Sequence, residues 1–413
     1  MTVPAVDSAV ATTPPAAPAL TPGYDAVLLA GFGGPEGPDD VMPFLRNVTR
    51  GRGIPDERLV EVSHHYQALG GSSPINEQNR RLRAALEAEL VARGVNLPVL
   101  WGNRNWTPLM ADVITEAAAA GQVRLLGLAT SAYSSYSSCR QYREDFGLAL
   151  AGTGLVGTVR IDKVRPYYDQ SGFVEPFVDD TAAALQEALA IGVTPAELEI
   201  VFTTHSIPST MAAASGSATL GDHDAAGAYV DQHLAVCRAV IDGVTAAMPD
   251  AGTLSWQLAY QSRSGPPTMP WLDPDINDVI KGLAASGRKG VVVVPVGFVS
   301  DHVEVVWDLD NEALETAAEC GLWFRRVATP GTDPRFVTAL VDLVVERLDD
   351  SAAAPQRISP TGLAPRPNFC AVGCCTNQRG VKPTTAGQDS ALDWQDTGVD
   401  PALLVASGIR QPG

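Results

Sequence analysis

Short apolar runs alternate with longer amphipathic segments from about residue 24 to about residue 348. Several of the short runs are apolar at successive positions, which indicates strands buried on both faces, as in a parallel sheet covered by helices. The alternation of strands and helices predicts right-handed βαβ units. The predicted strands span residues 24–33, 98–104, 123–133, 159–164, 198–206, 254–260, 289–298 and 322–328.

The predicted elements form two similar sets, with four strands before about residue 185 and four after about residue 197. We therefore expect an α/β fold of two doubly wound domains that face each other across a cleft, with ligands outside the carboxyl ends of the strands. The predicted parts are a disordered tail (1–22), a first domain (23–190), a second domain (191–350) and a cysteine-containing extension with a flexible tail (351–413).

The composition of the chain argues against several kinds of partner and location. A formal net charge of −18 over 413 residues argues against nucleic acid. No apolar run approaches the roughly 20 residues of a membrane helix, and the N-terminal stretch lacks the basic and apolar regions of a secretory signal. We expect a cytoplasmic protein without a transmembrane segment, whose cysteines lie in a reducing compartment where structural disulfides are uncommon.

Two predicted strand ends carry candidate chemistry. The stretch "LEIVFTTHSIP" ends its strand at His205, and "KGVVVVPVGFVSDHVEVVWDLDNEALE" continues into Glu304, Asp308 and Glu312. On an α-helix, a spacing of four places side chains on one face, so these carboxylates would form a ladder. A ladder that leads into a cleft suits the delivery of a cation or of protons, which His205 and Glu304 can bind or accept. A structural histidine and a solvated acidic face are the alternatives.

Two glycine-containing segments predict turns near a ligand. "GFGGPEGPDD" (31–40) fits a dinucleotide fingerprint only loosely, and it predicts a tight turn whose backbone approaches a flat ligand. "GGSSPIN" (70–76) predicts a helix that begins near Asn76, with backbone N–H groups suited to a carboxylate. Arg50 and Arg52 can bind the same charge, although exposed arginines are usually just solvated.

Half of the six cysteines, Cys370, Cys374 and Cys375, lie close together in "NFCAVGCCTN". A metal centre, a disulfide and chance composition are the three explanations that the residues themselves leave open. The other cysteines are Cys139, Cys237 and Cys320. We expect the last two to be ordinary buried cysteines.

Six segments resemble the ferrochelatases, which insert ferrous iron into a porphyrin. They are "FGGPEGPDDV", "YQALGGSSPIN", "SAYSSYSSCRQYRED", "VFTTHSIP", "WQLAYQSRSGPPTMPWL" and "GFVSDHVEVVWDLDNEA", and they follow the family's order between about residues 24 and 348. The resemblance implies two Rossmann-like chelatase domains around a porphyrin cleft, in agreement with the repeat.

The resemblance also implies site residues. His205 and Glu304 match the catalytic, iron-binding pair of the family, and Asp308 and Glu312 match a relay for protons or metal ions. Candidate substrate contacts are Ser73, Tyr142, Phe32 and Arg50. Phe32 stands where some soluble bacterial members have a tyrosine that ligates iron, and it has no ligand atom. We therefore expect the metal to arrive from the side of His205 and Glu304.

Some ferrochelatases hold a two-iron two-sulfur (2Fe–2S) cluster with three cysteines of a C-terminal extension and one from the body of the protein. By this resemblance Cys370, Cys374 and Cys375 supply three ligands, and Cys139 is the best fourth. A structural zinc ion bound by the same four sulfur atoms is the main alternative.

The segments are most similar to those of actinobacterial ferrochelatases, a branch that metallates coproporphyrin III. We therefore expect ferrous iron and coproporphyrin III as substrates, with protoporphyrin IX as the alternative, and a monomer that contacts neighbouring haem-pathway enzymes only transiently. A cobalt chelatase is a further alternative, because His302 can act as a second histidine near Glu304. A non-catalytic bilobal tetrapyrrole-binding protein is another, but it would not need the carboxylate ladder.

Overall fold

The computed structural model describes residues 23–51, 53–216, 227–265, 268–348, 357–371 and 373–386. The predicted tail 1–22, Arg52 and the last residues from 387 onward lie outside the described residues. No helix in the described ranges is long and apolar enough to cross a membrane.

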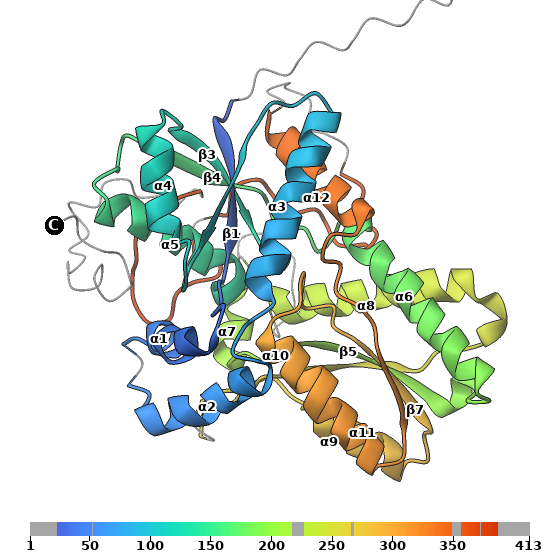
Figure 1. The fold of residues 1–413 in the computed structure, drawn as a ribbon. Coiled ribbons are helices and arrows are strands. Elements are labelled where there is room, and N and C mark those ends of the chain that lie inside the picture. Colours follow the sequence, from blue (N-terminus) through green and yellow to red (C-terminus); the bar gives the residue numbers. More distant parts are fainter. Residues whose placement is uncertain are drawn as a thin grey trace, which may run out of the picture.

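Two parallel four-stranded sheets form the framework (Figure 1). The first has the strand order β2-β1-β3-β4 and the second has the equivalent order β6-β5-β7-β8. The strands are β1 Ala26–Gly31, β2 Val99–Asn103, β3 Arg124–Ala129, β4 Arg160–Lys163, β5 Leu198–His205, β6 Trp256–Gln261, β7 Gly290–Val294 and β8 Trp323–Arg326. All eight predicted strands and the predicted repeat are confirmed.

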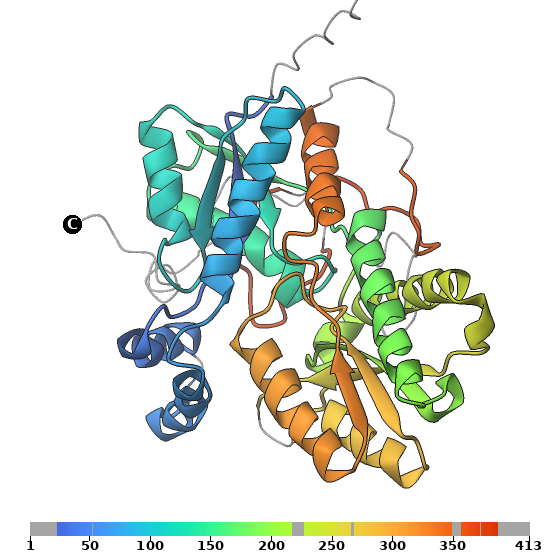
Figure 2. The same ribbon diagram turned by 45° about the vertical axis from the view of Figure 1, so that its right-hand side comes forward.

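Helices cover both sheets (Figures 1 and 2). In the first half they are α1 Pro38–Val48, α2 Asp56–Ala68, α3 Ile75–Ala92, α4 Met110–Ala119, the π-helix η1 Tyr136–Arg140, α5 Gln141–Gly152 and α6 Ser171–Ala190. In the second half they are η2 Pro195–Glu197, α7 Ser209–Ala213, α8 Ala228–Ala247, η3 Pro249–Ala251, α9 Ile276–Ala285, α10 Val303–Val305, the π-helix η4 Val306–Ala313, α11 Leu314–Glu319 and α12 Pro334–Leu348.

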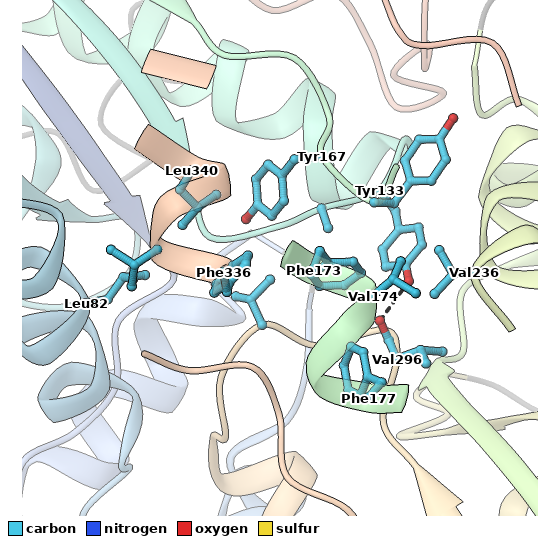
Figure 3. Close-up of a cluster of buried hydrophobic side chains, with 14 of the residues drawn as sticks. Leu82, Tyr133, Tyr167, Phe173, Val174, Phe177, Val236, Val296, Phe336 and Leu340 are labelled. Carbon is cyan, nitrogen blue, oxygen red and sulfur yellow. Dashed lines mark hydrogen bonds between the residues drawn. The ribbon is translucent and has the colours of Figure 1, made fainter. Parts of the chain in front are cut away.

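The last helix, α12, belongs to the second half by sequence but packs against both α3 and α6 (Figure 2). The largest hydrophobic cluster likewise contains residues from both halves, among them Tyr133, Phe173, Val236 and Phe336 (Figure 3). The two sheets are therefore held by a shared core, which fixes loops from both halves relative to each other. The domain boundary near residue 190 stays a prediction.

The extension after α12 runs along both halves. Arg143 of α5 donates a hydrogen bond from Nε to the carbonyl oxygen of Thr385 at 2.7 Å. The Gln378 amide donates to the carbonyl oxygen of Thr210 in α7 at 2.9 Å. The described part of the extension thus joins a helix of the first half to a helix of the second.

Candidate functional site

His205 and Glu304 lie side by side, although almost a hundred residues separate them in sequence. His205 is the last residue of β5, and Glu304 lies on α10, shortly after β7. The two strands are neighbours in a parallel sheet, so their carboxyl ends meet at one edge. Nε2 of His205 lies 3.6 Å from Oε2 of Glu304, and 34% of the histidine side chain and 52% of the glutamate side chain are exposed. A ligand can therefore reach the pair from solvent.

The hydrogen bonds of His205 determine which ring nitrogen is available. Its Nδ1 lies within hydrogen-bonding distance of the carbonyl oxygen of Ser206. Because a carbonyl oxygen only accepts, Nδ1 carries the hydrogen in the neutral ring. Nε2 then presents a lone pair on the side of Glu304, where it can accept a proton or bind a metal ion.

Asp308 lies on η4, four residues after Glu304. The hydroxyl of Ser262 and the amide of Gln261 donate hydrogen bonds to its carboxylate, the amide at 3.3 Å. Burial, together with the nearby charges of Glu304 and Glu312, raises the pKa of Asp308 to about 7, although the hydrogen bonds from Ser262 and Gln261 partly oppose this rise. A carboxyl group that titrates near neutral pH can both take up and release protons under physiological conditions.

The acidic ladder is not on the α-helix that its spacing predicts. Only residues 303–305 are α-helical before the π-helix η4 begins at Val306. Such wider turns are frequent at functional sites. Between the carboxylates, Val305 and Leu309 are fully buried, whereas Trp307 is only half-buried. The indole of Trp307 donates a hydrogen bond to Glu312 at 2.8 Å, so the outermost carboxylate is held in place.

Helix α2 contributes two residues that the sequence analysis missed. The ring of His65 stacks on Trp307 with centroids 4.4 Å apart and planes at 8°. Tyr66 is buried, and burial and the charge of Glu304 raise its pKa. The first half thus contacts the ladder through α2. The adjacent histidines in "SHHYQALGG" were the available signal, but nothing in their spacing relates them to residue 307.

His302, the second histidine of the cobalt-chelatase alternative, lies close behind the pair. Its ring packs edge-on against Phe298 with centroids 5.3 Å apart. Burial lowers the pKa of His302, and the charge of Glu304 partly offsets this effect. A ring kept neutral in this way retains a lone pair that can bind a metal ion.

The predicted substrate contacts occupy different environments. Phe32 follows β1 directly, is 38% exposed and lies edge-on to Phe44. Arg50 is exposed just after α1. Tyr142 is buried in the core beside the first sheet, with the guanidinium of Arg104 4.2 Å from its ring centre, so the structure does not place its ring at an open surface.

Glycines of the first segment make close contacts within the protein, and their predicted approach to a flat ligand stays a prediction. A Cβ atom on Gly31 would collide with the side chain of Asn103, and one on Gly34 would collide with Ser73. The lack of a side chain at these glycines makes room for Asn103 and Ser73, and this packing alone explains why glycine is found there. Ser73 is buried and its N–H group donates to the carbonyl oxygen of Pro35 at 2.8 Å, so this N–H is not available to a carboxylate.

The four cysteines named for a cluster come together in the structure. Their thiols contact one another in a row, Cys139 with Cys370, Cys370 with Cys374, and Cys374 with Cys375, the last pair at 3.8 Å. Gly216, three residues after the end of α7, donates its N–H to the sulfur of Cys375 at 3.2 Å. The row therefore joins η1, the extension and the second half.

The charges around these thiols are positive. The contact with Cys370 and burial raise the pKa of Cys139, whereas Lys163 and Arg143 lower it. Within the described ranges, no group of three or more His, Cys, Asp or Glu side chains is arranged to hold a metal ion. Of the remaining cysteines, Cys237 is fully buried as predicted, but Cys320 is only half-buried because it lies just beyond α11.

Comparison with known proteins identifies the family. The family model described as ferrochelatase matches residues 24–348, which is most of the chain. The chain belongs to the ferrochelatase family. The resemblance seen in the sequence is thereby confirmed, and the ferrochelatase match begins and ends where the predicted alternation of strands and helices does.

Several relatives are similar to this ferrochelatase over most of their length. The coproporphyrin III ferrochelatase of Leifsonia xyli is 58% identical over 372 residues, which cover 88% of this chain and 94% of the relative. That of Streptomyces griseus is 52% identical over 89% of this chain and 97% of the relative. The ferrochelatase of Rhodopirellula baltica is 42% identical over 89% and 97%.

Among solved structures, the match to SirB from Bacillus subtilis with Fe3+ covers 79% of this ferrochelatase and 96% of the SirB chain. Its TM-score is 0.43 and its sequence identity is 12%.

Proposed function

We propose that this ferrochelatase inserts Fe²⁺ into coproporphyrin III, with His205 and Glu304 as the catalytic pair. The observation that carries the proposal is the approach of Nε2 of His205 to Glu304 at 3.6 Å, beside a carboxyl group with a pKa of about 7. The names of the relatives that are 50–58% identical support this choice of porphyrin.

The reaction explains these residue types. Fe²⁺ binds the four pyrrole nitrogens while two N–H protons leave, so the charge of the porphyrin core is balanced and two protons must be accepted. The lone pair on Nε2 of His205 can accept a proton, and Glu304 stabilises the resulting imidazolium. Asp308 then takes up the proton and passes it towards Glu312 and solvent. The same carboxylates attract the incoming Fe²⁺, because hard oxygen and imidazole ligands both suit this ion.

A parallel turnover assay with two porphyrins tests the proposed substrate. Coproporphyrin III carries four propionates, whereas protoporphyrin IX carries two. Charge-assisted hydrogen bonds to the additional carboxylates are each worth about 1.5–3 kcal/mol, so kcat/KM should be at least about tenfold higher for coproporphyrin III. A higher kcat/KM for protoporphyrin IX would favour the alternative substrate. Turnover with Co²⁺ but not with Fe²⁺ would identify a cobalt chelatase. No turnover with either ion would favour the non-catalytic tetrapyrrole-binding protein.

We also infer that Cys139, Cys370, Cys374 and Cys375 hold a 2Fe–2S cluster. Their sulfur atoms lie in contact, and the N–H of Gly216 points at one sulfur, as is common around such clusters. The contact with Cys370 and burial raise the pKa of Cys139, and the charge of Lys163 offsets part of that rise. The zinc alternative uses the same four sulfur atoms.

Visible absorption of the anaerobically purified protein, with iron and sulfide analysis, tests the cluster. We expect a coloured protein with about two irons and two sulfides per chain, as the cluster formula requires. Cys374→Ser should abolish the colour. Cys320→Ser is the matched control and should retain it, because Cys320 lies outside the row of thiols. A colourless wild-type protein with one zinc ion per chain would show that the zinc alternative is correct.

A further inference from the structure

A tyrosine hydroxyl lies directly behind the backbone of the catalytic histidine. Tyr229, the second residue of α8, donates from its hydroxyl to the carbonyl oxygen of His205 at 2.9 Å. The hydroxyl of Thr204 lies 2.8 Å from the same oxygen atom of Tyr229. Because the tyrosine proton is used on the carbonyl, Thr204 is the donor in the second bond. The last two residues of β5 are therefore both bonded to one phenol.

The backbone of Tyr229 is held on both sides. Its N–H donates to the hydroxyl of Ser215 at 2.7 Å. Its carbonyl oxygen lies 2.6 Å from Nδ1 of His233, one turn later on α8. This carbonyl can only accept, so the ring of His233 carries its hydrogen on Nδ1. Burial lowers the pKa of His233 to about 3, so the ring stays neutral and keeps this tautomer at any physiological pH.

His233 links α8 to the loops that carry the rest of the site. Its ring stacks on Tyr133 with centroids 3.6 Å apart. The hydroxyl of Tyr133 donates to the carbonyl oxygen of Val296 at 2.8 Å (Figure 3). Val296 precedes Gly297, which packs so closely on Thr204 that a Cβ atom would collide with its hydroxyl oxygen. The chain then continues to Glu304.

The contacts thus form a closed circuit that links the end of β5 to the segment after β7. It passes through α8 and through Tyr133 of the first half, and its side chains are almost completely buried. The circuit begins at His205, whose Nε2 faces Glu304, and it returns to the segment after β7 that carries the carboxylate of Glu304. A displacement of about 1 Å at a catalytic group can cost about a hundredfold in rate, so such a circuit has a direct effect on catalysis.

We propose that Tyr229 is a positioning residue that sets the placement of the His205 ring relative to Glu304, and that His233 holds Tyr229 in register. The inference rests on the proposed roles of His205 and Glu304 in iron insertion. Tyr229 itself need not touch the porphyrin or the iron, because its hydroxyl donates its hydrogen bond to the carbonyl oxygen of His205 in β5.

Tyr229→Phe tests the proposal because it removes only the hydroxyl. We expect kcat to fall by about ten- to a hundredfold, because the histidine is misplaced, while KM for the porphyrin changes by less than about twofold. The pH profile of kcat should shift as well. Thr204→Val should lower kcat less, and the double variant should be no slower than Tyr229→Phe alone, since both remove members of one hydrogen-bonded unit.

Tyr167→Phe is the matched control. Tyr167 is equally buried and donates a hydroxyl hydrogen bond of 2.8 Å to a backbone carbonyl, that of Ala129, within the shared core. It should lose a similar amount of stability and keep the wild-type kcat and pH profile. Equal effects of the two variants on kcat, or a wild-type pH profile in Tyr229→Phe, would overturn the proposal.

An NMR measurement separates this inference from the proposed function. In histidine-labelled protein, the ring signals of His205, assigned with His205→Ala, should move in Tyr229→Phe and stay unchanged in Tyr167→Phe. This result does not depend on turnover. Unmoved ring signals would overturn the positioning role, whereas a wild-type protein without chelatase activity would contradict only the proposed function.

Discussion

Replacement of His205 with alanine is expected to abolish iron insertion and to leave porphyrin binding close to normal. The imidazole supplies the lone pair on Nε2 next to Glu304, and alanine has no group that can take a pyrrole proton or bind Fe²⁺. General base catalysis contributes about 10²–10⁴-fold, so kcat should fall by at least that range. Porphyrin binding depends on contacts over the whole macrocycle, so the dissociation constant, measured from absorption changes, should alter little.

His64→Ala is the matched control for this variant. His64 is an exposed histidine on α2, one residue before the ring that stacks on Trp307. Its removal should leave turnover within about twofold of wild type, as expected for a surface position with little effect on stability. Near-normal iron insertion by His205→Ala would contradict the assignment of the catalytic pair.

The second large effect concerns pH. The pKa of Asp308 is about 7 because the side chain is buried near Glu304 and Glu312. Below this pH the carboxyl group is protonated and cannot take up a further proton, so kcat should rise as pH increases through about 7. Asp308→Asn removes the ionisation and should eliminate that rise, with kcat low at all pH values. Glu315→Gln, an exposed position on α11, should retain the wild-type profile.

The same group affects stability with a defined sign. Its folded-state pKa of about 7 lies above the ordinary value of 3.8, so Asp308 favours the folded state at low pH. That contribution is complete below about pH 4 and is lost as pH rises through about 7, because the unfolded chain ionises first. In urea unfolding, Asp308→Asn should therefore gain stability relative to wild type between pH 5 and pH 8. A difference that is independent of pH would contradict the raised pKa.

The framework of the molecule could be predicted because its signals are local. Each strand is a run of apolar residues that the two helical layers bury, and the burial of β7, with all five residues inaccessible, shows how direct the relation is. The equivalent order of the two sheets follows from the repeat of these runs. The ends of the strands then brought His205 and Glu304 to one edge, as the parallel arrangement predicts.

The details that the sequence did not predict depend on contacts between distant segments. A spacing of four predicts an α-helix at residues 304–312, but hydrogen bonds from Gln261 and Ser262, at the end of another strand, accompany the π-helix found there. Tyr142 was chosen from its motif, and only the packing of Arg104 over its ring shows how deeply it is buried. The close contacts of the turn glycines could not be predicted, because their partners, such as Asn103, are remote in sequence.

The row of thiols has a consequence for the order in which the protein is made. Cys139 belongs to the first half, whereas Cys370, Cys374 and Cys375 follow the last helix, and the sulfur of Cys375 is bonded to the second half at Gly216. During synthesis the N-terminal parts of a chain emerge and fold first. The four sulfur atoms can therefore meet only after the ribosome has completed both sheets, so assembly of all four thiols requires that both halves have already been synthesised.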